Sequence, residues 1–342
     1  MNPLEAVYHY FYARRKRAAQ TNCVAFPATK IISVGNLSTG GTGKTPVVQW
    51  LAKSFESEGV KTAIVARGYG GEYSQCGAVV SDGEKILLTA SQVGDEAFLH
   101  ARTLLHTPVI IGRDRVATTR SAIEKFAPEV VLLDDGFQYW SLARDFDLVL
   151  LDARRPFGSG KLLPIGRLRE PQSALQRASG VLLTRADAAG EAELERAREE
   201  IGKWTSAPIF ISNHAPLSLR DEAGGEIHEL GVLPALPVAA LSALANNESF
   251  FQSLQKLKAE VRSTLARGDH HRWSEKEVRQ FASDAQRKGA KVLITTEKDA
   301  VKLDSAWCED LPLWSLRIEI KIENENELWG LISEKKPKKP GA

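Results

Sequence analysis

The sequence has little cysteine and no long hydrophobic run. Its 342 residues include only three cysteines, Cys23, Cys76 and Cys308, which are widely spaced and never form a CxxC pair. This spacing predicts neither a disulfide framework nor a zinc site, and it fits a reducing cytoplasm. No apolar run reaches the roughly 18 to 20 residues that a membrane-spanning helix needs, so we expect no such helix.

The sequence also lacks an excess of charge of one sign. It has 45 Lys and Arg against 43 Asp and Glu, a net charge of +2, so we expect no nucleic-acid partner. The 43% hydrophobic and 26% charged residues are typical of globular proteins, which excludes the disordered, collagen and coiled-coil classes. At roughly 150 residues per domain, the length predicts about two domains.

The first 20 residues combine an aromatic stretch with a basic cluster, and Pro3 suits the first turn of a helix. The residues concerned are Leu4, Val7, Tyr8, Tyr10, Phe11 and Tyr12, followed by Arg14, Arg15, Lys16 and Arg17. Because the charges follow the apolar stretch, the order of a secretory signal is reversed, and we expect the mature chain to begin here. The composition is typical of an interfacial helix on a membrane surface. A terminal helix docked on its own domain is the alternative interpretation.

Short, β-branched apolar runs alternate with helical stretches along the rest of the chain. The runs cover residues 30–34, 62–66, 109–111, 130–133, 148–151, 181–183, 209–211, 238–241, 292–295 and 313–318. Runs that are apolar on both faces indicate buried parallel strands, and the segments between them, such as 46–58 and 191–204, are long enough for crossover helices. We therefore expect an α/β fold with a mostly parallel sheet flanked by helices.

Composition shifts suggest where the domains begin and end. We expect an N-terminal interfacial helix at 1–20, a core domain at 21–216 and a smaller C-terminal α/β domain at 238–330. Between them, 217–237 mixes Gly, Pro and acidic residues and predicts a linker or hairpin. The basic segment 331–342 predicts a solvated, disordered tail.

The strongest motif is a glycine-rich loop between the first predicted strand and a helix. It contains Gly40, Gly41, Thr42, Gly43, Lys44 and Thr45, a GGxGK[ST] pattern similar to that of deviant P-loop proteins, with Ser38 where the strict GxxxxGK[ST] motif has glycine. Glycines let backbone N–H groups surround phosphate oxygens, and the lysine reaches the outer phosphates. The motif predicts a P-loop NTPase-like core that binds a nucleotide.

A second motif is the buried strand 130–133, which is followed by Asp134 and Asp135. An apolar strand that ends in a carboxylate is typical of a Walker B element. Because Mg²⁺ prefers hydroxyl and carboxylate oxygens, we assign Thr45 and Asp134 to a Mg²⁺ site, with Asp135 as the second candidate.

The order of eight motifs resembles the tetraacyldisaccharide 4'-kinase family over about residues 1 to 330. Besides the two above they are Ser33–Ser38, Arg67-Gly68-Tyr69-Gly70-Gly71, Val93-Gly94-Asp95-Glu96, Gly112-Arg113-Asp114-Arg115, Leu168-Arg169-Glu170-Pro171 and Thr295–Ala300. After Asp-Asp-Gly-Phe-Gln the family usually continues with histidine and basic residues, whereas this chain has Tyr139 and Trp140.

The resemblance implies an ATP-dependent enzyme with Mg²⁺ that phosphorylates the 4'-hydroxyl of the lipid A disaccharide precursor and gives lipid IVA. It implies that Asp95 and His270 are a catalytic pair acting with Lys44, with the carboxylate as base, in a cleft between the two domains. It further implies that Glu170 assists metal or nucleotide placement. The implied location is the cytoplasmic face of the bacterial inner membrane, as a peripheral protein, and we expect a monomer.

Two other functions remain open from the residues alone. A nucleotide-switch ATPase or GTPase acting on a protein partner would use Thr184-Arg185-Ala186-Asp187 as a base-recognition loop. A soluble small-molecule kinase would share the core but would have no use for the aromatic and basic N-terminal helix.

Overall fold

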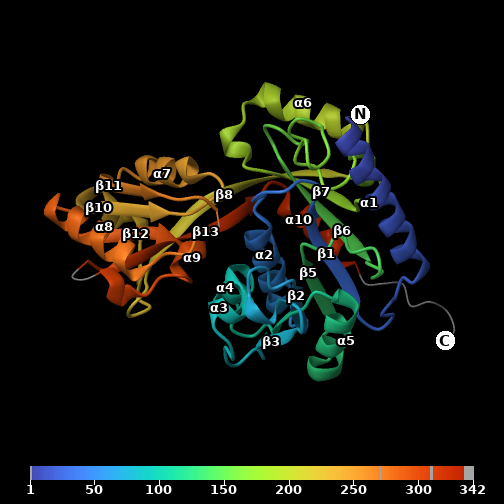
Figure 1. Cartoon of the computed structure of the whole chain (residues 1–342), viewed down its shortest axis with the longest axis horizontal. Coiled ribbons are helices and arrows are strands. Elements are labelled where there is room, and N and C mark those ends of the chain that lie inside the picture. Colours follow the sequence, from blue (N-terminus) through green and yellow to red (C-terminus); the bar gives the residue numbers. More distant parts are fainter. Residues whose placement is uncertain (1, 270, 309–310, 335–342) are drawn as a thin grey trace. The chain divides into compact units, whose positions relative to one another are not determined.

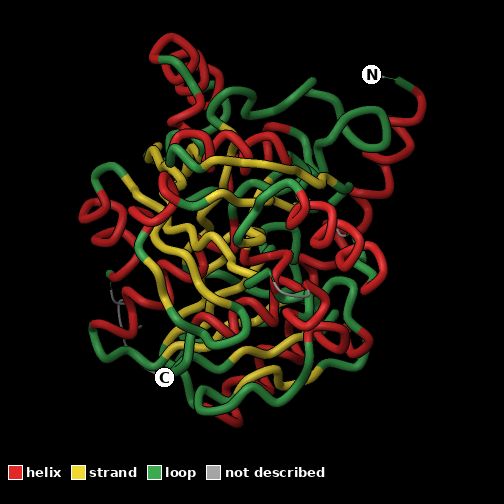
Figure 2. The backbone as a smooth tube through the Cα atoms, turned by 90° about the vertical axis from the view of Figure 1, so that its left-hand side faces the viewer, coloured by secondary structure: helices red, strands yellow, loops and turns green. Residues whose placement is uncertain are grey.

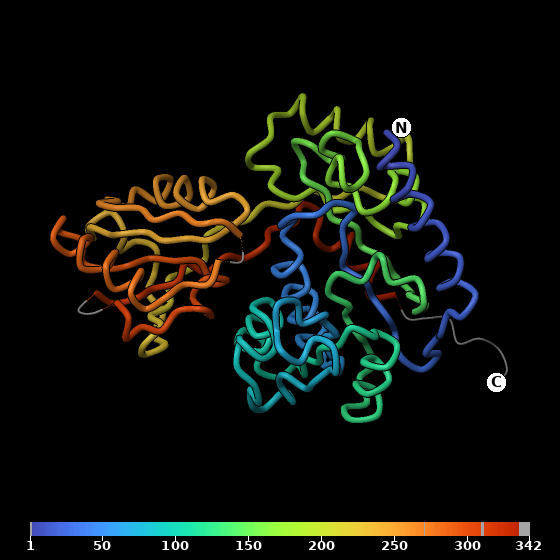
Figure 3. Tube along the Cα trace, in the orientation of Figure 1, coloured from blue at the N-terminus to red at the C-terminus, as the bar shows by residue number. Residues whose placement is uncertain are grey.

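The structure is a computed structural model that describes residues 2–269, 271–308 and 311–334 (Figure 1). The chain forms two compact units, one of residues 1–214 and 320–342 and the other of residues 215–319. Two strands, β8 (Ile209–Asp221) and β13 (Leu313–Ile322), carry the chain from one unit to the other. Figure 3 follows this path by residue number.

These boundaries differ from the expected ones. Of the two alternatives for segment 217–237, the structure has the hairpin: β8 continues to Asp221 and pairs antiparallel with β9 (Ile227–His228), and the 3₁₀ helix η4 (Leu230–Ala235) follows. The second unit therefore begins at residue 215 rather than near 238. It ends at residue 319, because the last strand and helix return to the first unit.

The first unit contains a mostly parallel sheet with the strand order β8-β7-β6-β1-β5-β2-β4-β3. Its other strands are β1 (Lys30–Asn36), β2 (Thr62–Ala66), β3 (Ala78–Ser81), β4 (Val109–Ile111), β5 (Val130–Asp134), β6 (Phe146–Asp152) and β7 (Gly180–Thr184). Only the edge pairing of β3 with β4 is antiparallel among the pairings described within this unit. The α/β class with a mostly parallel sheet is thus confirmed.

Helices cover both faces of this sheet (Figure 2). The helices of this unit are α1 (Pro3–Thr21), α2 (Lys44–Ser57), α3 (Ala90–Val93), α4 (Asp95–Thr103), α5 (Arg115–Phe126), α6 (Glu191–Gly202) and α10 (Glu325–Ser333), with 3₁₀ helices η1 (Glu72–Ser74), η2 (Gln172–Arg177) and η3 (Ala186–Ala188). Successive strand residues face opposite sides, so Ile32 packs with α2, α4 and α10 while Ile31 packs with α5. Both faces are apolar, and the sheet is buried between two layers.

The second unit has its own parallel sheet in the order β11-β10-β12-β13. The remaining strands are β10 (Pro237–Ser242), β11 (Glu260–Ala266) and β12 (Val292–Thr296), and the helices are α7 (Asn247–Lys256), α8 (Glu275–Arg287), α9 (Glu297–Ala300) and η5 (Ser305–Cys308). One core cluster lies between the sheet and α7, and another lies between the sheet and α8. This is the smaller α/β domain that the sequence predicts.

Within the described residues, no helix combines the length and the hydropathy needed to cross a membrane. The buried side of the N-terminal helix α1 consists of aromatic and charged residues. Its half-buried residues Tyr8, Tyr12 and Lys16 recur every fourth position, and they follow the buried Glu5 on the same side of the helix. This side faces the rest of the first unit.

Candidate active site

The glycine-rich loop connects β1 to α2, as the sequence predicts. Gly43 caps α2 with a left-handed backbone (φ 80°), and Gly40 also has positive φ (120°). The side-chain amide of Asn36, the last residue of β1, donates to the hydroxyl of Thr42 over 3.0 Å. The helix begins at Lys44, so its unpaired backbone N–H groups and positive dipole end lie at the loop. This geometry is typical of a phosphate-binding loop, and the segment between β1 and α2 is called the phosphate loop below.

Two side chains support this loop, one just after the carboxyl end of β7 and one from the middle of β8. Arg185 donates to the carbonyl oxygen of Gly41 and pairs with Asp152 over 2.9 Å. The ring of His214 occupies the space beside Gly43, where an added Cβ would lie 2.6 Å from Nε2. A side chain at position 43 would therefore meet both backbone strain and a steric clash. No local sequence pattern marks His214, so it could not be predicted as part of the site.

Burial and the nearby charge of Arg185 lower the pKa of His214 to about 4. The imidazole is therefore neutral at pH 7. Its Nε2 atom is buried and has no hydrogen-bond partner in the described structure. Arg185 belongs to the loop that would recognise a base in the nucleotide-switch hypothesis, but here its guanidinium holds the phosphate loop.

Asp135 lies opposite the lysine of the phosphate loop. It has positive φ (58°), which turns the chain sharply after β5. Its carboxylate lies 3.6 Å from Lys44 Nζ and 2.8 Å from an Arg169 guanidinium nitrogen. Burial by itself would raise the pKa of Asp135, but the charges of Lys44 and Arg169 outweigh that effect and hold the pKa below its usual value. Asp135 is therefore ionised at neutral pH.

Asp134, the preceding residue, has different surroundings. Its Oδ2 atom lies 3.0 Å from Nε2 of His100, and both side chains are almost fully buried. In this hydrogen bond the carboxylate oxygen accepts and the ring N–H of His100 donates. A guanidinium nitrogen of Arg115 donates to the Asp134 carbonyl oxygen over 3.4 Å. Burial lowers the pKa of Arg115 to about 10, so its charge remains at neutral pH.

Asp95 is the first residue of α4, the helix that also carries His100. The preceding Gly94 has positive φ (88°), and an added Cβ there would lie 2.3 Å from the carbonyl oxygen of Tyr69. Glycine is thus required where the Arg67–Gly71 motif packs against the start of α4. The contact between His100 and Asp134 ties α4, and with it Asp95, to the end of β5.

His270, the predicted partner of Asp95, lies outside the described residues. Its neighbours are held by ion pairs in the second unit: Asp269 contacts Lys298 over 3.0 Å, and His271 contacts Glu277 over 2.9 Å.

Glu170 does not have the surroundings of a metal ligand. Its side chain is fully buried, and both carboxylate oxygens are engaged by other side chains. Gln138 donates to Oε1 over 3.0 Å, Tyr12 donates to Oε2 over 2.9 Å, and Arg177 contacts both oxygens at 2.9 Å. Glu170 thus holds neighbouring elements together, and its part in metal or nucleotide placement stays a prediction from the resemblance.

The remaining candidates fit a hard cation. Asp134 and Asp135 each have a buried Oδ1 atom that makes no hydrogen bond within the described residues. In that same part of the chain, no group of three or more His, Cys, Asp or Glu side chains is placed to hold a metal. A pair of carboxylates with the hydroxyl of Thr45 matches the way in which Mg²⁺ is held jointly by protein and phosphate oxygens.

Comparison with known proteins gives consistent matches. A model of the family described as tetraacyldisaccharide-1-P 4'-kinase matches residues 1–336. The tetraacyldisaccharide 4'-kinase of Anaeromyxobacter sp. (strain K) is 43% identical over 276 residues, which cover 81% of this chain and 73% of the relative. That of Halothermothrix orenii is 34% identical over 350 residues, covering 96% and 90% of the two chains.

A solved structure also matches along almost the whole chain. It is LpxK from Aquifex aeolicus in complex with ATP, which is 29% identical, with a TM-score of 0.78 and 96% of each chain covered. The match confirms the predicted P-loop kinase fold.

Proposed function

Because this chain belongs to the tetraacyldisaccharide-1-phosphate 4'-kinase family, we propose that it transfers the γ-phosphate of ATP to the 4'-hydroxyl of a tetraacylated glucosamine disaccharide 1-phosphate. This reaction gives lipid IVA in lipid A biosynthesis. The observation that carries the proposal is the phosphate loop with Lys44 facing Asp135 at the end of β5. Family membership does not favour the nucleotide-switch alternative.

Phosphoryl transfer depends mainly on positioning and on neutralisation of charge. In the proposed mechanism, the N–H groups of residues 40–45 surround the phosphates of ATP, and Lys44 neutralises the charge on the transferring group. The ion pair of Lys44 with Asp135 keeps the ammonium group at the loop before nucleotide binds. The phosphates then compete with Asp135 for the same cation.

The proposed cofactor is Mg²⁺, held by Thr45 and Asp134 or Asp135 together with ATP. When bound, Mg²⁺ supplies positive charge to the phosphate oxygens. His100 would orient Asp134 for this role, because it binds the Oδ2 atom and leaves Oδ1 without a hydrogen-bond partner within the described residues. Carboxylates that ligate a metal are typically held by such outer hydrogen bonds.

Asp95 is the proposed general base. Its carboxylate accepts the proton of the 4'-hydroxyl while the sugar oxygen bonds to the γ-phosphorus and the bond to the bridging oxygen breaks, which releases ADP. The resemblance makes His270 the partner that orients Asp95 or shares its proton. Both assignments remain predictions.

The activity is tested by incubating the protein with γ-labelled ATP and the tetraacyl disaccharide 1-phosphate in detergent. We expect label in a lipid product with one phosphate more than the substrate. A protein that hydrolyses ATP or GTP without labelling the lipid would contradict the proposal and would favour the nucleotide switch.

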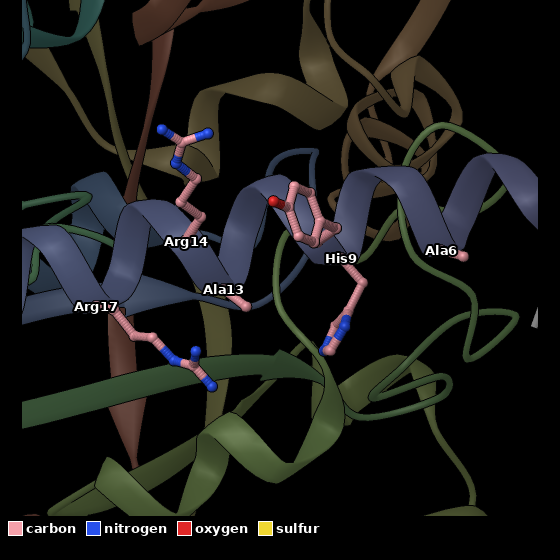
Figure 4. Close-up of a pocket in the computed structure, with 6 residues that line it drawn as sticks. Ala6, His9, Ala13, Arg14 and Arg17 are labelled. Carbon is pink, nitrogen blue, oxygen red and sulfur yellow. The ribbon is translucent and has the colours of Figure 1, made fainter.

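We further propose that the enzyme is a monomer that binds the cytoplasmic face of the inner membrane through α1. The outward side of this helix exposes Leu4, Val7, Tyr10 and Phe11, each more than half accessible. A surface hollow of about 380 Å³ runs along the same helix (Figure 4), and its lining includes Arg14 and Arg17. Aromatic rings and basic groups on one surface favour an anionic membrane. Tyr8 and Tyr12 do not belong to this surface, because their hydroxyl groups bond inward.

The double substitution Val7→Ser and Phe11→Ser tests this surface while leaving Tyr8 and Tyr12 in place. Each buried apolar side chain contributes about 1.5 to 3 kcal/mol, so we expect binding to anionic liposomes to weaken at least tenfold. Leu105→Ser, at another exposed leucine (65% accessible), is the matched control. Unchanged liposome binding by the double variant would limit α1 to the role of a docked terminal helix.

A further inference from the structure

The inward side of α1 is hydrogen-bonded to a short segment, residues 167–170, which we call the anchor strip. The Tyr8 hydroxyl donates to the carbonyl oxygen of Arg169 over 2.9 Å, and the Tyr12 hydroxyl donates to the carboxylate of Glu170 over 2.9 Å. One turn earlier, Glu5 accepts from the backbone N–H of Leu162 over 2.9 Å. A surface helix needs only apolar contacts to dock, so three polar contacts on one side indicate a fixed position.

The opposite side of the anchor strip contacts the phosphate loop. The backbone N–H of Arg169 donates to the Leu37 carbonyl over 2.7 Å, and the N–H of Thr39 donates to the Arg167 carbonyl over 2.8 Å. The guanidinium of Arg169 reaches Asp135 over 2.8 Å. The same four residues thus bind α1 on one side, and the loop and its facing carboxylate on the other.

The half-buried side chains of Gln138 and Arg169 and the buried Glu170 reinforce this connection. Gln138 donates both to Glu170 over 3.0 Å and to the carbonyl oxygen of Asn36 at the end of β1 over 2.9 Å. Arg169 in turn donates to the side-chain oxygen of Gln138 over 3.2 Å. Each group in a closed polar network of this kind limits the positions open to the others.

Tyr12 also packs against Trp140, which stands just after the Asp-Asp-Gly-Phe-Gln motif at a point where this chain departs from the usual family pattern. The rings meet edge to face at 5.5 Å, and Arg15 lies 5.8 Å above the Trp140 ring. Burial, followed by the charge of Glu170, raises the pKa of Tyr12. The phenol therefore keeps its proton, and it can donate to Glu170 throughout the physiological pH range.

We propose that Tyr8 and Tyr12 are positioning residues through which α1 sets the position of Arg169, and therefore of Asp135 opposite Lys44. This inference rests on the proposed kinase function, because it assigns α1 a role in turnover. That role is separate from membrane binding, since the residues concerned lie on the side of α1 that faces away from the exposed apolar surface.

The test is Tyr12→Phe, which removes one hydroxyl and keeps the ring against Trp140. With detergent-dispersed substrate, so that membrane binding plays no part, we expect kcat to fall about tenfold, equivalent to about 1.4 kcal/mol of transition-state stabilisation. The dissociation constant for ADP should change less than about twofold, because Lys44 and the glycine loop are intact. Tyr73→Phe, which removes a tyrosine hydroxyl in η1 outside this network, is the control and should behave as wild type.

A second arm separates positioning from a general loss of structure. If Tyr12 acts through Arg169, Tyr12→Phe combined with Arg169→Lys should lower kcat by less than the product of the two single effects. The inference would be overturned if kcat of the double variant fell by the product of the two single effects, or if Tyr12→Phe left kcat unchanged. In either case, activity of the wild-type protein would still support the proposed function. An inactive wild-type protein in the same assay would overturn the proposed function and this inference with it.

Discussion

Two adjacent carboxylates at the end of β5 have opposite surroundings. Asp135 lies in a partly accessible cluster of cations, with Lys44 on one side and Arg169 on the other. Asp134 is buried against the ring of His100, with Arg115 at its carbonyl oxygen. These two consecutive residues therefore differ in their partners. Asp135 pairs with two cationic side chains, whereas Asp134 pairs with one buried histidine.

The difference indicates a division of tasks. Asp135 contacts Lys44 of the phosphate loop and Arg169, whose carbonyl oxygen is bonded to α1. We therefore expect Asp135 to affect the placement of phosphate. Asp134 is hydrogen-bonded to His100 of α4, and Asp95 is the first residue of the same helix. The end of β5 therefore connects the phosphate-binding elements with the element that carries the proposed base. Substitutions near Asp135 and substitutions near Asp134 should therefore differ in how they change kcat and nucleotide affinity.

The largest effect is expected for Lys44→Ala, on the phosphate side. This variant loses the cation that neutralises the transferring group, and each lost 1.4 kcal/mol lowers the rate about tenfold. We expect no measurable lipid labelling in the γ-phosphate transfer assay. Retention of more than about a tenth of wild-type turnover would contradict the assignment of the loop.

A smaller effect is expected for His100→Asn, on the side of Asp134. Loss of this buried contact should lower the free energy of unfolding by about 1 to 3 kcal/mol, because the carboxylate loses its partner. It should also lower kcat, because α4 is no longer held at the end of β5. Urea unfolding and steady-state kinetics measure the two quantities. The exposed His106→Asn, close to the C-terminal end of α4, is the control, and equal behaviour of the two variants would count against the link.

The smallest effect is expected for His214→Gln, behind the phosphate loop. The pKa of His214 is lowered from 6.5 to about 4 in the folded protein. Between these values the unfolded chain binds a proton that the folded chain does not, so His214 makes wild-type stability fall as the pH falls. The difference in unfolding free energy between wild type and variant should therefore shrink from about pH 7.5 to about pH 5. Parallel pH profiles would show that His214 is not buried as described.

The parallel strands of the first unit could be predicted from sequence because both of their faces are apolar, whereas the antiparallel edge strand β3 was not predicted. The runs at 62–66 and 109–111 coincide with β2 and β4, and the other predicted strands extend by a few residues at most within this unit. No apolar run marks β11, whose residues alternate between exposed and half-buried at the edge of the second sheet. An edge strand needs only one buried face, so its signal is weak.

The candidate site could be predicted only where its residues belong to local motifs. The phosphate loop and the two aspartates follow from spacing along the chain. His100, His214 and Gln138 owe their importance to contacts with residues far away in sequence, such as the bond from His100 to Asp134. The buried partners of Glu170 could not be predicted for the same reason, because a motif does not show which side chains converge on it.

The most direct test of the division of tasks is Asp95→Asn, with kcat and ATP affinity measured in the same preparation. The amide keeps the shape of the carboxylate but cannot accept the proton of the sugar hydroxyl. We predict that kcat falls by about 10² to 10⁴ while the dissociation constant for ATP stays within about twofold of wild type. An unchanged kcat would remove Asp95 as the base, and a parallel loss of ATP affinity would show that the two sides of the β5 end do not act separately.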